Sequence, residues 1–224
     1  MIGLTIAGFD PSGGAGILED VKTMASLGVH PTAVSTSLTA QNPKRVFSVQ
    51  PVSVEYISEQ IDSIFDEYEI KYAKTGLLYS KEIIQLVSKK VEEYDLSIVV
   101  DPVMVASAGA KLGKDEIASK LKRHLLKKSV LTTPNLSEAE KLSNIKIESL
   151  DDAKEAAYKI GKYCNVIITG GHLNGKNIIY NKMQDYLSRI QRNIKQLKNI
   201  DLEKEFADKI CLDVDIEKLA LDLC

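Results

Sequence analysis

Residues 8–16 read Gly8-Phe9-Asp10-Pro11-Ser12-Gly13-Gly14-Ala15-Gly16 and follow directly on an apolar run at residues 2–7. A helical pattern begins at Gly16, so this stretch predicts a strand, a glycine-dense loop and a helix. Glycine has no Cβ, so backbone amides in such a loop can approach a substrate or a phosphate closely. The loop matches neither the Walker A pattern nor G-x-G-x-x-G. We therefore predict a ligand-binding turn, with a plain strand-to-helix turn as the alternative.

The composition is that of one globular domain, or of one domain with an appendage: 224 residues, 44% hydrophobic and 27% charged. The formal net charge of -2 favours neither nucleic acid nor an anionic membrane as a partner. No apolar run approaches the roughly 20 residues that span a bilayer, and we see no secretion signal. Cys164, Cys211 and Cys224 show no metal-like spacing. We expect a reduced, cytoplasmic protein.

Short β-branched runs alternate with longer amphipathic ones along the first three quarters of the chain. We expect strands at residues 2–7, 32–40, 70–75, 96–100, 130–133 and 166–169, and helices at 16–27, 54–65, 81–91, 115–126 and 150–163. This alternation is typical of βαβ units. The sequence therefore predicts an α/β fold with a mainly parallel central sheet and helices on both faces.

Ligands in such sheets collect at the carboxyl ends of the strands. Five polar or glycine-bearing segments follow the expected strands: residues 8–16, 40–42, 74–76, 101–104 and 134–138. We expect them to converge in one cleft, and this convergence indicates a site more strongly than any segment alone.

The pattern changes after Gly175, the last glycine of the sequence. Apolar residues then recur with a 4-3-4-3 spacing, which is typical of a helical stripe: Met183, Leu187, Ile190, Ile194 and Leu197. A second set suggests another helix: Phe206, Ile210, Val214 and Leu219. We therefore divide the chain into an α/β domain at residues 1–175 and a divergent helical segment at 176–224, which packs on the sheet or on a second subunit.

Five motifs occur along the chain in the order in which one known family has them. They are residues 5–16, 39–42, 101–104, 133–140 and 170–173. Together they resemble the hydroxymethylpyrimidine/phosphomethylpyrimidine kinases of thiamine biosynthesis, which belong to the ribokinase-like superfamily. The resemblance covers about residues 1–175. It implies a ribokinase-like fold, ATP and Mg²⁺ as cofactors and a small pyrimidine as substrate, with a homodimer as the expected assembly.

The resemblance also implies a pyrimidine pocket, lined by Ala15, Thr39, Gln41, Leu77 and Val103. An aminopyrimidine presents a hydrogen-bond donor beside an acceptor, and the side-chain amide of Gln41 can answer both. The alternative for Gln41 is a solvated turn residue. The alternative for Ala15 and Val103 is that they only pack against neighbouring side chains.

Asp101 and Lys74 are the expected catalytic residues. Asp101 ends an apolar strand, where a carboxylate can hold Mg²⁺ through water or orient a lysine. It could instead cap a turn before Pro102. Lys74 either helps to bind anionic phosphate or is a solvated lysine at a strand end.

The remaining candidates concern the metal and the nucleotide. Asn135 and Glu138 form an N-x-x-E pattern, which the resemblance associates with Mg²⁺ and phosphate positioning. The same pattern also predicts an N-cap with a capping box, and the two roles are compatible. The resemblance implies that the backbone at Thr169, Gly170 and Gly171 faces the nucleotide phosphates, although the family usually has a lysine where this chain has Thr169.

The sequence departs from the family further downstream. The family carries a Gly-Thr-Gly-Cys segment that forms an anion hole for the transferred phosphate, and this sequence has no glycine beyond Gly175. Cys211 lies within a helical pattern and does not replace the motif. Phosphoryl transfer depends on positioning and charge stabilisation, and losing one such donor costs roughly 10²–10³ in rate in other enzymes.

Three functions remain open from the sequence. The first is an ATP- and Mg²⁺-dependent kinase acting on 4-amino-5-hydroxymethyl-2-methylpyrimidine and its monophosphate. The second is a non-catalytic pyrimidine-binding or regulatory protein, or a truncated relic of that kinase. The third is a pyridoxal-type vitamin kinase, against which the glycine-rich loop and the Ala40-Gln41-Asn42 segment favour the thiamine substrate.

Overall fold

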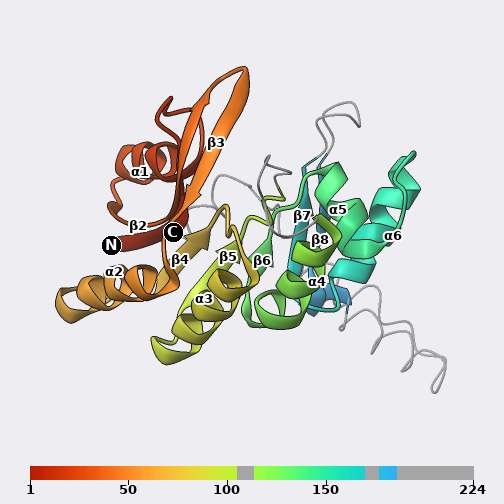
Figure 1. Ribbon diagram of the computed structural model, residues 1–224. Helices are drawn as coiled ribbons and strands as arrows, with labels where there is room; N and C mark the ends of the chain where they lie inside the picture. Colours follow the sequence, from red (N-terminus) through yellow and green to blue (C-terminus); the bar gives the residue numbers. More distant parts are fainter. Residues whose placement is uncertain (105–113, 170–176, 186–224) are drawn as a thin grey trace, which may run out of the picture.

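The computed structural model describes residues 1–104, 114–169 and 177–185 (Figure 1). Within this part of the chain an 8-stranded sheet has the order β3-β2-β1-β4-β5-β6-β7-β8. The strands are β1 (Ile2–Phe9), β2 (His30–Asn42), β3 (Arg45–Pro51), β4 (Tyr72–Thr75), β5 (Ser97–Val100), β6 (Leu131–Thr132), β7 (Asn165–Ile168) and β8 (Ile178–Tyr180). Six neighbouring strands, from β2 to β7, run parallel, and β3 and β8 pair antiparallel at the two edges.

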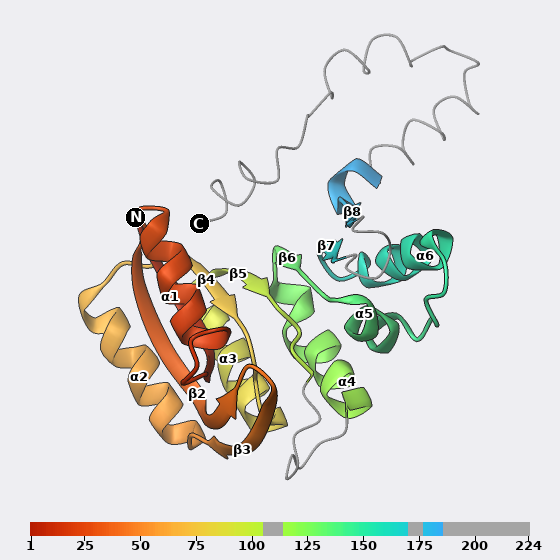
Figure 2. The same ribbon diagram turned by 90° about the horizontal axis from the view of Figure 1, so that it is seen from above.

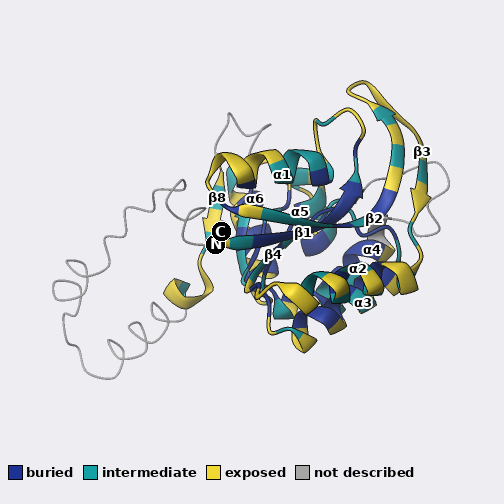
Figure 3. Ribbon diagram, turned by 90° about the vertical axis from the view of Figure 1, so that its left-hand side faces the viewer, coloured by how far each residue is buried: buried dark blue, intermediate teal, exposed yellow. Residues whose placement is uncertain are grey.

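Helices cover both faces of the sheet, as the sequence predicts. They are α1 (Gly16–Ser26), α2 (Val54–Glu67), α3 (Lys81–Glu93), α4 (Lys114–His124), α5 (Leu136–Ser143) and α6 (Leu150–Ile160), with a 3-10 turn, η1, at Leu126–Lys128. α1 packs on β1 and β2, whereas α2 to α6 pack successively against one another along the sheet (Figure 2). Figure 3 shows α1 on one side of the sheet and α2 and α3 on the other. None of the helices in the described part of the chain is long and apolar enough to cross a bilayer.

The main core lies between the sheet and the row of helices from α2 to α6. Leu4, Ile6, Ile98, Val100 and Ile168 are fully buried there. In β4, β5 and β7 buried residues alternate with half-buried ones, because successive side chains of a strand point to opposite faces. The apolar runs identified in the sequence therefore form one continuous core that holds the strand ends in place.

The structure differs from the sequence expectation at three elements. β3 is an exposed edge strand, which pairs with the end of β2 to form a hairpin that rises from the rest of the sheet (Figure 1). α5 occupies the segment that we treated only as a capping motif. β8 lies at the start of the segment expected to be helical, where it pairs with β7. Short edge elements carry little periodicity, so their sequences predict them poorly. Residues 186–224, the bulk of the expected helical segment, lie outside the described residues.

Gly16 is the residue at which β1, the loop and α1 are joined. Its φ is +58°, a conformation that residues with a side chain rarely adopt. A Cβ at this position would lie 2.2 Å from the carbonyl oxygen of Gly8, which is backbone and cannot move aside cheaply. Phe9 and Gly16 also form an isolated antiparallel bridge. Only glycine can close the loop this tightly.

We predict that Gly16→Ala destabilises the fold by more than about 2 kcal/mol, because it combines left-handed strain with a backbone clash. Gly28 provides the matched control: its φ is +75°, but nothing lies within 4 Å of an added Cβ. Gly28→Ala is therefore expected to cost only about 1–2 kcal/mol. Urea denaturation of both variants measures the difference, and equal losses would show that the close approach at Gly16 is unimportant.

Candidate functional site

The parallel strands bring the predicted segments to one edge of the sheet. The glycine-rich loop follows β1, Gln41 lies at the end of β2, Gly76 follows β4, residues 101–104 follow β5, and Asn135 lies beyond β6. Because the carboxyl ends of parallel strands share one edge, all five segments lie on the same side of the sheet.

The glycine-rich loop is organised by its own acidic residue, Asp10, which is buried. One carboxylate oxygen, Oδ1, accepts hydrogen bonds from the Ser12 backbone N–H at 2.8 Å and the Ser12 hydroxyl at 2.7 Å. The Gly14 backbone also helps to lower the pKa of this carboxylate, and the Gly13 N–H donates to the Asp10 carbonyl at 3.1 Å. Several of the amides that we expected to be available to a ligand are thus directed at Asp10.

Asp10 also contacts Gln41, the predicted ring-binding residue. The Gln41 side chain lies close to the Asp10 carboxylate and helps to lower the pKa of Asp10. A register shift between Ala40 and Gln41 marks a bulge in β2, and bulges re-aim side chains near functional sites. Because a carboxylate only accepts hydrogen bonds, the amide NH₂ of Gln41 is the end suited to face Asp10, which leaves the amide oxygen to accept from a substrate amine.

The protonation of Asp10 follows from the same contacts. Burial by itself would raise the pKa of Asp10, but hydrogen bonds from Ser12, Gln41 and the loop backbone outweigh it and lower the pKa below its usual value of 3.8. Asp10 is therefore a stable anion that several donors share. The sequence contains a local indication of this role, because an Asp followed two residues later by Ser is typical of an Asx turn.

Three other predicted pocket residues lie around the same loop. Thr39 donates its hydroxyl to the Phe9 carbonyl at 3.0 Å, which ties the hairpin to the start of the loop. Ala15 is the exposed N-cap of α1. Leu77 is half-buried beside Gly8, where a Cβ built on Gly8 would be 3.5 Å from the Leu77 side chain.

Val103 lies further along the edge, after β5. It is half-buried, and its N–H donates to the Asp101 carbonyl at 2.9 Å. The structure therefore places four of the predicted pocket residues around β1, β2 and the end of β4, with Val103 beside the catalytic candidates.

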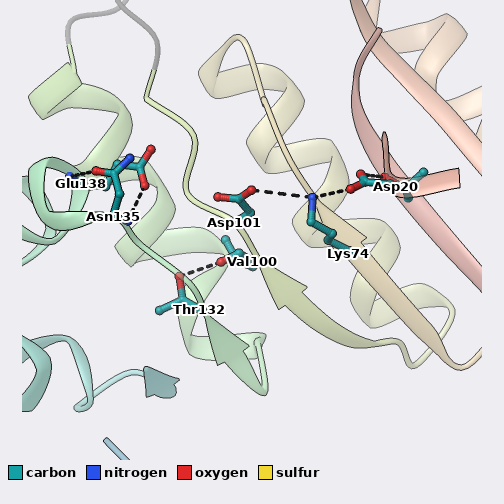
Figure 4. A network of polar contacts seen from close by, with 8 residues as sticks. Asp20, Lys74, Val100, Asp101, Thr132, Asn135 and Glu138 are labelled. Atoms are coloured by element: carbon teal, nitrogen blue, oxygen red, sulfur yellow. Dashed lines mark hydrogen bonds and ion pairs between the residues drawn. The ribbon is translucent and has the colours of Figure 1, made fainter. Parts of the chain in front are cut away.

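Lys74 and Asp101 meet at this edge, together with a residue that the sequence analysis missed (Figure 4). The Lys74 ammonium lies 2.9 Å from Asp20 Oδ1 and 3.7 Å from Asp101 Oδ2. Asp20 belongs to α1 and is separated from Lys74 by 54 residues, so no local pattern could reveal the contact. The Lys74 ammonium therefore lies between two carboxylates, and 32% of the side chain is exposed.

Burial raises the pKa of Asp101 above its usual value, and the Asp20 carboxylate adds to this, whereas Lys74 acts in the opposite direction. A desolvated carboxylate of this kind gains from a neighbouring cation. About a third of the Asp101 side chain is exposed, so a ligand can reach it.

Asn135 and Glu138 form the capping box at the start of α5. The Glu138 N–H donates to Asn135 Oδ1 at 3.0 Å, and the Asn135 N–H donates to Glu138 Oε2 at 2.9 Å. Thr169 lies alongside, since it bridges with Asn135 and donates its N–H to the Pro134 carbonyl at 3.0 Å. The structural role of the N-x-x-E pattern is confirmed, and its ligand role stays a prediction. Gly170 and Gly171 lie outside the described residues.

The oxygen donors at this edge fit a magnesium ion bound together with phosphates. Within the described ranges, no three His, Cys, Asp or Glu side chains are grouped closely enough to form a metal site by themselves. Mg²⁺ is usually held by one or two carboxylates, with waters and substrate phosphates completing its shell. Asp101, in a desolvated position, is one candidate for such a carboxylate, and Glu138 is the other.

Comparison with known proteins gives consistent matches. A family model described as phosphomethylpyrimidine kinase matches residues 10–205. The chain is 42% identical over 185 residues to a hydroxymethylpyrimidine/phosphomethylpyrimidine kinase of Bacillus subtilis (strain 168), a match that covers 81% of this chain and 68% of that protein.

Solved structures of two kinases are also similar to the chain. A phosphomethylpyrimidine kinase from Clostridium difficile 630 superposes with a TM-score of 0.72 at 37% identity, covering 81% of each chain. An ADP complex of Bacillus subtilis pyridoxal kinase superposes with a TM-score of 0.74 at 35% identity, covering 81% of this chain and 72% of that one.

We predict that Asp10→Asn destabilises the protein at pH 7 by about 1–3 kcal/mol, because it removes a charged acceptor of several hydrogen bonds. A lowered pKa in the folded state contributes stability above the unfolded value and loses it as the pH falls through the folded value. The stabilities of wild type and variant should therefore converge below pH 3.8. Urea denaturation from pH 7 to pH 3 measures this, with the exposed Asp66→Asn as control. A constant difference across that range would contradict the proposed role of the Asp10 charge.

Proposed function

The chain belongs to the phosphomethylpyrimidine kinase family, and we propose that it phosphorylates 4-amino-5-hydroxymethyl-2-methylpyrimidine and then its monophosphate at the expense of ATP. The observation that carries the proposal is the placement of two groups at one sheet edge: Gln41 against the glycine-rich loop, and the Lys74–Asp101 ion pair beyond it. The first group recognises a heteroaromatic ring and the second meets phosphate.

Ring recognition follows from the orientation of Gln41. With its NH₂ directed toward the nearby Asp10 carboxylate, the amide oxygen accepts from the 4-amino group of the pyrimidine. Ala15, Thr39, Leu77 and Val103 are proposed to bound the ring. A flat apolar enclosure with one oriented amide is typical of a small-molecule pocket.

In the transfer step the hydroxymethyl oxygen forms a bond to the γ-phosphorus, the bond from that phosphorus to the β,γ-bridging oxygen breaks, and ADP leaves. The hydroxymethyl proton passes to solvent water as the new bond forms. Lys74 supplies positive charge for the phosphoryl oxygens, because such transfer depends on charge stabilisation. Asp101 and Glu138 would hold Mg²⁺, which when bound neutralises phosphate charge. Asn135, Thr169, Gly170 and Gly171 are proposed to face the nucleotide.

One observation favours a second candidate, a protein that binds the pyrimidine without transferring phosphate. The sequence has no glycine beyond Gly175, so it lacks the Gly-Thr-Gly-Cys segment that the family places at the transferred phosphate.

We propose that an active form obtains the missing donors from another chain, and that the protein itself is a homodimer. A cytoplasmic location and the absence of a nucleic-acid partner are part of the same proposal, and the net charge of -2 supports the latter.

A third candidate is a pyridoxal-type kinase, because a pyridoxal kinase is among the similar structures. The family match favours the pyrimidine. Measuring turnover of both compounds with the same preparation separates these two candidates.

We predict that Gln41→Leu raises KM for the pyrimidine roughly 10- to 100-fold with a much smaller change in kcat, because it removes hydrogen bonds made equally in the ground and transition states. Gln50→Leu is the matched control, an exposed glutamine on the other strand of the same hairpin. Steady-state kinetics with each variant measures the effect. A KM equal to that of the control would remove Gln41 from the pocket.

We predict that Asp101→Asn lowers kcat by about 10²-fold or more, since the charge stabilisation that it helps to supply is worth several kcal/mol. The assay follows ADP release with Mg-ATP, and calorimetry follows binding of the pyrimidine to the same protein. ADP release by the wild type that is lost or strongly reduced in Asp101→Asn supports the kinase. Wild-type binding without ADP release would instead establish the non-catalytic binding protein.

A further inference from the structure

Lys74 has two acidic partners at unequal distances. The contact with Asp20 Oδ1, at 2.9 Å, is a hydrogen-bonded ion pair, whereas Asp101 Oδ2, at 3.7 Å, lies beyond hydrogen-bonding distance. A lysine side chain is long and flexible, so the partner that holds it most closely decides where its charge lies. In this structure that partner is Asp20.

Asp20 is itself fixed from two directions. Its Oδ2 accepts a hydrogen bond from the Thr5 hydroxyl on β1 at 2.6 Å. Its Oδ1 accepts a hydrogen bond from Lys74 (Figure 4). Only 12% of the Asp20 side chain is exposed, compared with 32% for Lys74. Asp20 lies in the second turn of α1, whose start is set by the tight loop at Gly16.

We propose that Asp20 is a positioning residue for phosphoryl transfer. It holds the Lys74 ammonium away from a close pair with Asp101, so that the cation faces the transferred phosphoryl group and the Asp101 carboxylate stays available for Mg²⁺. This inference rests on the proposed function. Without Asp20, the ammonium closes on Asp101 and competes with the metal for that carboxylate.

Lys90 provides a comparison with Lys74, because it belongs to an ion-pair cluster whose role is structural. The Lys90 ammonium lies 2.5 Å from Asp62 Oδ1 and 3.2 Å from Glu93 Oε2, and only 7% of its side chain is exposed. Asp62 also accepts from the Tyr94 hydroxyl at 2.6 Å. This cluster joins α2 and α3 and involves none of the strand ends. The Lys74 group differs because it is partly exposed and lies at the edge that carries the candidate site.

The kinetic test compares Asp20→Asn with two controls. Glu19→Gln removes the same charge from the neighbouring, more exposed position of α1, where Glu19 pairs with Lys22. Asp62→Asn removes the carboxylate of the structural cluster.

We expect Asp20→Asn to lower kcat about tenfold or more, as for other residues that orient a functional group. KM for the pyrimidine should stay within about twofold, because the ring contacts of Gln41 are separate. The Mg²⁺ concentration for half-maximal activity should rise. Asp20→Glu should recover part of the kcat, and both controls should keep the wild-type value. An Asp20→Asn variant whose kcat and Mg²⁺ dependence match those of Glu19→Gln would overturn the proposal.

A second measurement needs no turnover. Urea denaturation of Asp20→Asn, Lys74→Met and the double variant forms a thermodynamic cycle. We expect the loss in the double variant to be smaller than the sum of the single losses, whereas Glu19→Gln and Lys74→Met should be additive. Additivity of Asp20→Asn with Lys74→Met would overturn the placement of Lys74 by Asp20. If the wild-type chain releases no ADP, the proposed function fails, and this cycle still decides the placement.

Discussion

Parallel pairing of the six strands from β2 to β7 is the constraint on which the candidate site depends. Parallel strands need a crossover for each connection, so their carboxyl ends share one edge of the sheet and the turns that follow them become neighbours. Segments as distant as the glycine-rich loop and the start of α5 are brought to that edge by backbone hydrogen bonding and core packing. The polar side chains of the candidate site play no part in this step.

At that edge, two buried or nearly buried carboxylates organise the groups that meet a ligand. Asp10 interacts with the loop backbone and with the side-chain amide of Gln41, and Asp20 accepts hydrogen bonds from Thr5 and Lys74. Neither is proposed to touch the substrate. Each uses its charge to orient a flexible side chain, since charge-assisted hydrogen bonds are stronger than neutral ones. The loop and α1 are therefore parts of one support, joined at Gly16.

The proposed site accounts for two related activities on one fold. The chain is similar to a phosphomethylpyrimidine kinase and to a pyridoxal kinase, and the group proposed to meet phosphate, Lys74 with Asp101, is separate from the group proposed to bind the ring at Gln41. Because the two proposed groups come from different strands, one can change while the other is kept. Function must be argued from such sites, and the fold alone does not specify it.

The sequence by itself determined the alternation of strands and helices, the tight glycine loop, the capping box at Asn135 and Glu138, and the family to which the chain belongs. These features are local: hydrophobic periodicity, backbone freedom at glycine and contacts a few residues apart. It did not reveal β3, β8 or Asp20. The edge strands are short and exposed, and Asp20 meets Lys74 across 54 residues. Only the tertiary structure decided which distant charged side chains form an ion pair. The pairing of Asp20 with Lys74 depends on where the packed sheet places α1 relative to β4.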